Sequence, residues 1–204
     1  MSEPAAPRRR GCALCLRPYS ACICRWVTPV AHQVEVLILQ HPLEVDHAKN
    51  TARLLHMSLP GSRLLTGEAF AAPELDAAMD DAAQEPKYTV LLYPETLREP
   101  APALDMDRLT DPARVRLVVL DATWRKSRKM LHLNPSLGLL PRLPLEELPA
   151  SGYLIRKAHR PDQLSTLEAT CAALAQLEGD AEKYQPLRQA FDGFVGQQLA
   201  FRPT

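Results

Sequence analysis

The stretch Val115-Arg-Leu-Val-Val-Leu120 decides the fold class, because an almost continuous apolar run predicts a strand that is buried on both faces. Two comparable runs, Val34-Glu-Val-Leu-Ile-Leu39 and Tyr88-Thr-Val-Leu-Leu-Tyr93, predict two more strands of the same kind. Amphipathic segments that predict helices lie between and after them. Strands and helices in this alternation predict an α/β fold, with a mostly parallel sheet that is covered by helices on both faces.

Weaker apolar patterns complete the expected order of elements. Helical spacing predicts helices at residues 45–59, 73–83, 123–133, 165–177 and 186–199, and short apolar runs predict strands at 63–65 and 152–155. Residues 1–30 lack this periodicity and contain four of the five cysteines. We therefore expect a small loop-rich module at residues 1–30 and a larger α/β domain at residues 31–204.

The composition argues against several classes of protein. With 204 residues, 46% of them hydrophobic, the chain can form one well-packed domain and a small appendage. Its 24 basic and 24 acidic residues balance, which disfavours a nonspecific coat for nucleic acid but allows a local basic patch. No apolar stretch approaches the roughly 20 residues that span a bilayer, and no apolar segment follows the N-terminal arginines. We therefore expect a cytosolic protein.

Four cysteines lie close together in the sequence, as Cys12-x2-Cys15-x6-Cys22-x-Cys24. Two close pairs separated by a short loop can place four sulfur ligands around one tetrahedral zinc ion. The segment has too few apolar residues to fold by burial alone, so a bound metal would supply the missing stabilisation. The alternative is a set of unrelated free cysteines, one or two of them redox-active. Cys171 lies on an apolar helical stripe and is expected in the core.

The strongest candidate site is Asp121-Ala-Thr123-Trp124, which directly follows the Val115–Leu120 strand. Ligands of open α/β sheets bind beyond the carboxyl ends of the strands. Trp124 offers a ring that can stack on a base, whereas the structural alternative is that Asp121 or Thr123 only caps the next helix. The front of that helix contains Arg125, Lys126, Arg128 and Lys129. Positive side chains at the start of a helix oppose the helix dipole, and a phosphate bound nearby would offset this cost. The alternative is that these residues form only a solvated basic face.

Further polar motifs are expected at the same edge of the sheet. Gln40-His41-Pro42-Leu-Glu44 and Lys49 follow the first strand, and Tyr93-Pro94 closes the second. The basic run Arg156-Lys157-Ala-His159-Arg160 suits contact with an RNA backbone. Ser165-x-x-Glu168 has the form of a capping box, so helix initiation alone would explain both residues. The absence of glycine-rich phosphate loops and of a Gly-x-Ser-x-Gly turn argues against dinucleotide enzymes, P-loop ATPases and serine hydrolases.

In combination these motifs resemble those of the DTW-domain family, the tRNA-uridine aminocarboxypropyltransferases. The resemblance extends over nearly the whole chain. It consists of the cysteine module, Gln40-His41-Pro42-x-Glu44 with Lys49-x-Thr51-Ala52, the strand ending in Tyr93-Pro94, Asp121-x-Thr123-Trp124, and Arg156-Lys157 with Leu164-Ser165-Thr166-Leu167-Glu168-Ala169. The usual signature has glycine where this chain has Ala122, a small change that should preserve the turn.

The resemblance implies a SPOUT-like fold, often knotted near its C-terminal side, and transfer of the aminocarboxypropyl group of S-adenosylmethionine to N3 of a uridine in tRNA. Because the N3 proton of uridine must leave, Asp121 is the candidate base, oriented by Thr123; the alternative is that Asp121 holds the donor's ammonium. The donor site is expected to include Leu92, Tyr93, Pro94, Trp124, Ser165, Thr166 and Glu168. The tRNA is expected to contact Gln40, His41, Lys49, Arg125, Lys126, Arg156, Lys157 and Arg160.

Two other functions are compatible with the same motifs. An RNA methyltransferase of this architecture would use the same donor but transfer its methyl group. A non-catalytic zinc adaptor that binds RNA or protein would bind no donor and would leave the strand-end motifs without a role. The transferase hypothesis requires the loops with Gln40, Tyr93, Asp121 and Ser165 to converge at one edge of the sheet.

Overall fold

The computed structural model describes residues 11–79, 86–94, 101–145 and 164–201. The strands of these segments form one sheet in the order β2-β1-β4-β3-β5, in which every neighbouring pair is parallel. They are β1 (Glu35–Gln40), β2 (Arg63–Thr66), β3 (Tyr88–Leu92), β4 (Val115–Asp121) and β5 (Arg142–Leu143). The parallel α/β sheet expected from the apolar runs is therefore confirmed.

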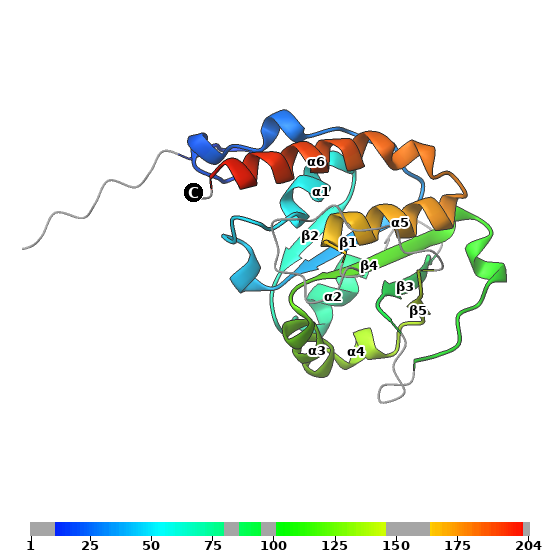
Figure 1. Ribbon diagram of the computed structural model, residues 1–204. Helices are drawn as coiled ribbons and strands as arrows, with labels where there is room; N and C mark the ends of the chain where they lie inside the picture. The colour runs from blue at the N-terminus through cyan, green and yellow to red at the C-terminus, as the bar shows by residue number, and fades with distance from the viewer. Residues whose placement is uncertain (1–10, 80–85, 95–100, 146–163, 202–204) are drawn as a thin grey trace, which may run out of the picture.

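Helices cover both faces of this sheet (Figure 1). On one face lie α1 (Ala52–Ser58), α5 (Thr166–Glu178) and α6 (Gln185–Ala200), and on the other lie α2 (Ala72–Met79), α3 (Trp124–Leu133) and α4 (Pro135–Gly138). Successive strand residues point to opposite faces, so Leu117 packs in the first apolar cluster and Val118 in the second. Because both faces are covered, the three central strands have consecutive apolar residues, at 36–39, 90–92 and 117–120. None of the described helices is long and apolar enough to cross a membrane.

The cysteine-rich segment packs against the second half of α6 (Figure 1). The Trp26 ring lies so close to Gly193 that a Cβ atom at that position would be 2.2 Å from Cζ3 of the ring. Trp26 Nε1 donates to Gln197 Oε1 at 2.5 Å, and Gln197 Nε2 donates to the carbonyl oxygen of Cys22 at 3.1 Å. The described segments also contain six short 3-10 helices: η1 (Tyr19–Ala21), η2 (Cys24–Trp26), η3 (Pro42–Glu44), η4 (Asp107–Leu109), η5 (Pro112–Arg114) and η6 (Glu182–Tyr184).

Some predicted elements differ from the structure. The helix predicted at 45–59 was wrong in its first half: α1 begins at Ala52, because Asn50 Oδ1 accepts the Ala52 N–H and the preceding residues form turns. The short helix α4 was not predicted; it begins at Pro135, where the missing N–H costs nothing. β5 was not predicted, since two residues give no periodicity. Residues 80–83 of one predicted helix and the strand predicted at 152–155 lie outside the described residues.

A buried ion cluster lies at the amino ends of the central strands, a feature that the apolar pattern did not reveal. Arg116 is 1% exposed, and its Nε donates to Glu35 Oε1 at 2.8 Å. Arg63 and Lys87 also pair with Glu35. Burial alone would raise the Glu35 pKa, but hydrogen bonds from Arg116 and Arg63 outweigh it and lower the pKa to about 2. The cluster is therefore charged at neutral pH.

Candidate active site

Asp121, the last residue of β4, lies at the centre of the candidate site and is 4% exposed. Three side chains from different parts of the chain donate hydrogen bonds to its carboxylate. Gln40 Nε2 lies 2.9 Å and Asn50 Nδ2 2.5 Å from Oδ2, and Thr166 Oγ1 lies 2.7 Å from Oδ1. The alternative that Asp121 only caps α3 is wrong, because its carboxylate faces these donors and no side-chain cap begins α3.

The parallel register explains why these residues meet. Gln40 is the last residue of β1 and pairs directly with Asp121 across the β1–β4 ladder. The carboxyl ends of both strands therefore open at the same edge of the sheet, where Thr166 begins α5. Thr123 was expected to orient Asp121, but Thr166 makes that contact; Thr123 is the N-cap residue of α3 and its carbonyl accepts the N–H of Ser127.

The electrostatic setting of Asp121 suits a proton acceptor. Burial raises the pKa of this carboxyl, and the nearby Glu44 carboxylate raises it further. Hydrogen bonds from Gln40, Thr166 and Asn50 act in the opposite direction without cancelling the effect of burial. A carboxylate with a raised pKa is a better base at neutral pH than an ordinary aspartate.

A small polar pocket opens beside Asp121, between the end of β4, the start of α5 and the segment 44–51, which we call the pocket loop. The lining residues are Glu44, His47, Lys49, Asn50, Thr51, Asp121, Ala122, Ser165 and Thr166. They offer carboxylate oxygens, an ammonium group, an amide and hydroxyls within one site. A ligand with both a positive and a negative charge, such as an α-amino acid group, finds complementary partners there.

The start of α5 is held by a capping box. Ser165 Oγ accepts the Glu168 N–H at 3.2 Å, and Glu168 Oε2 accepts the Ser165 N–H at 2.7 Å. Thr51 Oγ1 accepts the N–H of Leu167 at 3.3 Å, which joins the pocket loop to α5. Helix initiation, the alternative given for this motif, therefore explains the position of Glu168, whereas Ser165 both caps the helix and lines the pocket.

An aromatic pair lies further along the same edge. Tyr93, directly after β3, meets Trp124 in a T-shaped contact with ring centroids 5.6 Å apart. Arg142 of β5 lies on the Tyr93 ring, with Cζ 5.2 Å from its centroid. Leu92 is half-buried at the end of β3 and Pro94 is exposed. Trp124 is 54% exposed, so its ring can accept a stacked base. The ends of β1, β3 and β4 thus open at the same edge of the sheet, but neither Tyr93 nor Trp124 lines the pocket at Asp121.

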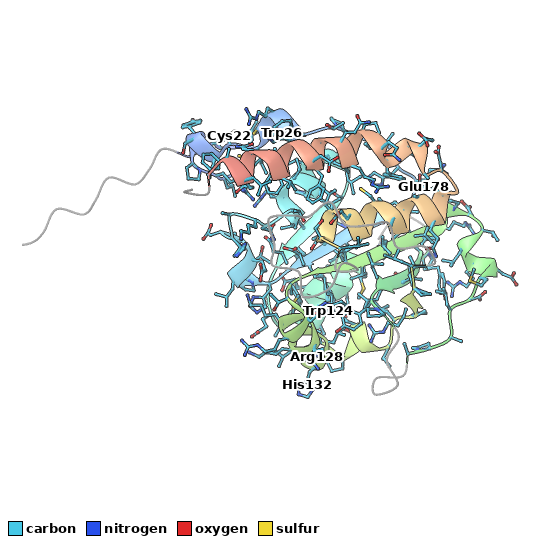
Figure 2. The ribbon with its side chains drawn as sticks, viewed as in Figure 1. Cys22, Trp26, Trp124, Arg128, His132 and Glu178 are labelled. Atoms are coloured by element: carbon cyan, nitrogen blue, oxygen red, sulfur yellow. The ribbon has the colours of Figure 1, made fainter. Side chains whose placement is uncertain are left out.

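The basic residues of α3 divide into two groups. Lys126 Nζ lies 2.8 Å from Glu44 Oε1, and Lys129 Nζ lies 2.8 Å from Glu68 Oε2. Arg125 and Arg128 are exposed and have no ion pair within the described segments. Figure 2 labels Trp124, Arg128 and His132 one after another along α3. Carboxylates thus neutralise the lysines and leave the arginines available to an external anion.

The remaining residues predicted for RNA contact differ in their surroundings. Gln40 and His41 are buried; His41 Nδ1 accepts the Leu43 N–H at 3.1 Å, so Nε2 bears the proton donated to Glu68 Oε1 at 3.0 Å. Lys49 is half-buried in the pocket lining. Arg156, Lys157 and Arg160 lie outside the described residues.

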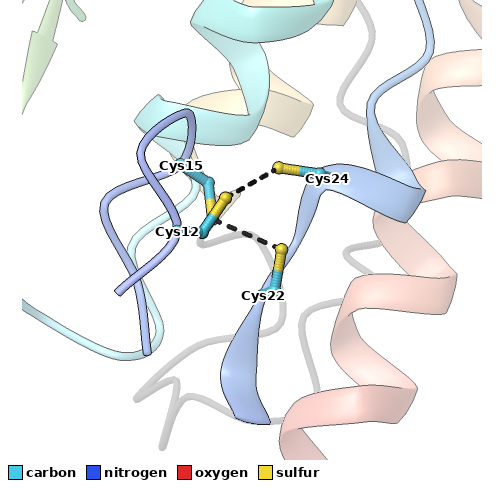
Figure 3. Close-up of side chains that lie close together, drawn as sticks. All are labelled: Cys12, Cys15, Cys22 and Cys24. Carbon is cyan, nitrogen blue, oxygen red and sulfur yellow. Dashed lines mark hydrogen bonds between the residues drawn. The ribbon is translucent and has the colours of Figure 1, made fainter. Parts of the chain in front are cut away.

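The four cysteines of the N-terminal segment come together as the sequence predicts (Figure 3). Their sulfur atoms all lie within 4.8 Å of one another, with 3.5 Å between the Cys12 and Cys24 sulfurs and 3.7 Å between those of Cys15 and Cys22. Four sulfurs at about 2.3 Å from a tetrahedral zinc ion would be about 3.8 Å apart. The cluster can therefore hold a metal ion, whereas the alternative of unrelated free cysteines does not explain their convergence.

The electrostatics of the cluster also fit a metal site. Hydrogen bonds from the backbone N–H groups of Cys15 and Leu14, and then from the Cys24 thiol, lower the pKa of Cys12 to about 6. Burial and the shared hydrogen bonds with the other thiols raise the pKa of Cys24 to about 12. A divalent cation bound to these sulfurs would displace the remaining thiol protons.

Sequence patterns missed two features of the site. Asn50 binds Asp121, yet it was only an unassigned position between Lys49 and Thr51. Glu44 was quoted as part of a motif without a role, although it lines the pocket and pairs with Lys126. Asn50 lies two residues before α1, where a side-chain amide can bind the backbone and a neighbour at once, but the helix predicted at 45–59 concealed that position.

A buried aspartate bound by amides lies beside a pocket at the carboxyl edge of a parallel sheet, and four sulfurs nearby in the sequence can hold a metal ion, so the chain is an α/β protein with a small cysteine-rich module. The chain belongs to the DTW-domain family, whose model matches residues 9–199.

The chain is also similar to curated proteins. tRNA-uridine aminocarboxypropyltransferase 2 of Drosophila melanogaster is 33% identical over 184 residues, which cover 88% of this chain and 71% of that protein. The protein of the same name from Mus musculus is 29% identical, covering 85% of this chain and 58% of its own. tRNA-uridine aminocarboxypropyltransferase A of Arabidopsis thaliana is 29% identical, covering 65% and 54%. The chain thus spans less than two thirds of the mouse and plant proteins. No solved structure matches it.

Proposed function

We propose that this protein is a tRNA-modifying enzyme that transfers the 3-amino-3-carboxypropyl group of S-adenosylmethionine to N3 of a uridine in tRNA. The observation that supports it most directly is the pocket at Asp121, which combines carboxylates with an ammonium group. The group to be transferred ends in an α-amino acid, whose ammonium and carboxylate match those partners. The names of the relatives support the same reaction.

The proposed chemistry follows from the position of Asp121. Uridine N3 attacks the γ-carbon of the donor in line with the sulfonium sulfur; the N3–Cγ bond forms, the Cγ–S bond breaks, and methylthioadenosine leaves. The N3 proton passes to Asp121, whose raised pKa favours its acceptance. Gln40 and Asn50 hold the carboxylate in one orientation, and a fixed approach of the reactants can contribute about 7–11 kcal/mol.

Trp124 and Tyr93 are proposed to lie against the donor or the uridine base, since their rings line the same edge as Asp121. Arg125 is proposed to bind the tRNA backbone, because it is exposed in the first turn of α3, next to that edge. Arg156, Lys157 and Arg160 remain proposed RNA contacts from the sequence. Replacement of Arg125 by glutamine should raise the Michaelis constant for tRNA and reduce its salt dependence.

Zinc is the metal proposed for the cysteine cluster, because four thiolates in tetrahedral arrangement are its usual structural ligands. Bound there, it would crosslink a segment with little apolar core. We further propose a division into the zinc module at residues 1–30 and a catalytic domain at 31–204, a SPOUT-like fold as the family resemblance implies, and a cytosolic location.

The deciding experiment uses two isotopically labelled donors. With tRNA and donor labelled in the carboxyl carbon, transfer should place the label in uridine, whereas donor labelled in the methyl carbon should leave tRNA unlabelled. Asp121→Asn should abolish transfer and retain the fold, because the amide keeps acceptor and donor atoms for its neighbours. The matched control is Asp192→Asn on the exposed side of α6. Methyl label in tRNA would indicate a methyltransferase, and no donor binding by calorimetry would indicate an adaptor.

A further inference from the structure

Arg17 connects the cysteine cluster with the pocket. We propose that Arg17 is a positioning residue through which the four-cysteine cluster holds the pocket loop in its ligand-binding conformation. The expected effect of Arg17 on donor binding and transfer rests on the proposed function. It depends on a continuous series of contacts from the sulfurs to Asp121. Each contact joins neighbours within hydrogen-bond distance.

The guanidinium of Arg17 binds two carbonyl groups of the pocket loop. Its Nη1 donates to the Ala48 oxygen at 2.6 Å, and its Nη2 donates to the Asn50 oxygen at 2.8 Å. The planar, rigid group thereby fixes the distance and the relative orientation of the two carbonyls. Arg17 also lies over the Phe194 ring of α6, with Cζ 5.3 Å from the ring centroid. Its side chain is therefore held between α6 and the pocket loop.

The position of Arg17 depends on the cluster. Arg17 follows Cys15 by two residues, and its carbonyl accepts the Cys12 N–H at 2.8 Å. Leu16, between them, has a φ of 60°, in the left-handed region that a leucine rarely adopts. The N–H of Leu16 donates to the Cys12 oxygen at 2.9 Å, which closes this turn. Ligation of Cys12 and Cys15 to one ion would keep the turn closed and Arg17 directed at the loop.

The other end of the series is Asn50. Its carbonyl accepts from Arg17, and its side chain donates to Asp121, accepts from Gln40 Nε2 at 3.2 Å and accepts the Ala52 N–H at 3.0 Å. A shift of the Asn50 backbone therefore removes a donor from the Asp121 carboxylate and disturbs the start of α1. Arg17 is not one of the residues that line the pocket, and its hydrogen bond to the Asn50 carbonyl connects it with Asp121.

The test compares Arg17→Ala and Arg17→Lys with a matched control, Arg25→Ala. Arg25 belongs to the same segment, but its guanidinium lies over Trp26, 4.7 Å from the ring centroid, and not on the pocket loop. Three quantities are measured: bound metal, hydrogen exchange of the amides at 44–52, and binding and transfer of S-adenosylmethionine.

We expect Arg17→Ala to retain its metal, to exchange faster at 44–52, and to lose about tenfold in donor affinity or turnover, a size typical of coupling between linked sites. Arg17→Lys, with one donor group in place of two, should lie between Arg17→Ala and the wild type. Arg25→Ala should match the wild type. Removal of the metal with a chelator should speed hydrogen exchange of the amides at 44–52 in the wild type, but should cause no further increase in Arg17→Ala. Adding Arg17→Ala to Asn50→Ala should cost little more than Asn50→Ala alone.

Two results would overturn the inference. Wild-type exchange at 44–52 in Arg17→Ala would show that the loop is held without Arg17. Loss of metal from Arg17→Ala would show that the residue acts on the cluster itself. If the proposed function is wrong, the wild type will not bind the donor. The role of Arg17 is tested separately, because hydrogen exchange at 44–52 can be measured without turnover.

Discussion

Replacement of Glu35 by glutamine should change the stability of the protein in a pH-dependent way. Glu35 accepts hydrogen bonds from Arg116 Nε at 2.8 Å and Nη2 at 3.1 Å, and it also pairs with Arg63 and Lys87. A neutral amide cannot balance these charges. Because Arg116 is 1% exposed, the substitution leaves a buried cation without its carboxylate.

The magnitude follows from the Glu35 pKa, which is lowered from 4.5 to about 2 in the folded protein. This depression corresponds to about 3 kcal/mol of stability at neutral pH. A lowered folded-state pKa stabilises the protein above the unfolded pKa of 4.5, and the contribution is lost as the pH falls towards 2. Glu35→Gln should therefore unfold about 3–5 kcal/mol more easily at pH 7, with a difference that shrinks below pH 4.5.

Urea unfolding of both proteins between pH 7 and pH 2.5 measures this difference, followed by circular dichroism. Glu74→Gln on the exposed side of α2 is the matched control and should follow the wild type throughout. Equal stability of Glu35→Gln and wild type at pH 7, or a difference that stays constant down to pH 2.5, would refute the reasoning.

Three further substitutions test the module and the site. Gly193→Ala places a Cβ 2.2 Å from the Trp26 ring, so we expect the free energy of unfolding to fall by about 1–3 kcal/mol. In a Trp124→Phe background the fluorescence of Trp26 should also shift, and unchanged emission would contradict the close packing. Cys24→Ser should lose bound metal by mass spectrometry, and full retention would exclude a four-thiolate site. Thr166→Val leaves Asp121 Oδ1 without its donor and should cost about 1–3 kcal/mol in thermal unfolding and weaken donor binding, whereas Thr166→Ser should behave as wild type.

The central strands and the cysteine cluster were predictable because their signals are local. The run at 115–120 is apolar at every position except Arg116, and a strand covered on both sides is the usual setting for that pattern. The spacing of Cys12, Cys15, Cys22 and Cys24 likewise indicates a convergent site before any coordinates are known. The position of Asp121 at the end of a strand gave the edge of the sheet where the site lies.

The pocket loop was not predictable in the same way. Apolar residues at 45, 48, 52, 55 and 59 have helical spacing, but only the part from Ala52 onward packs as a helix. The first part is held by Arg17 and Asn50, whose partners are 31–33 and 71 residues away in the chain. Contacts at that separation leave no periodic pattern in the sequence.

The amino-acid sequence by itself determined the parallel α/β class, the cysteine cluster and the edge of the sheet at which the pocket opens, since burial and cysteine spacing are properties of adjacent residues. Only the tertiary structure decided which side chains hold Asp121, which lysines of α3 are neutralised, and that Arg17 joins the cluster to the pocket. Hydrogen bonds and ion pairs between distant segments depend on strand order and register, and those are set when the whole chain packs.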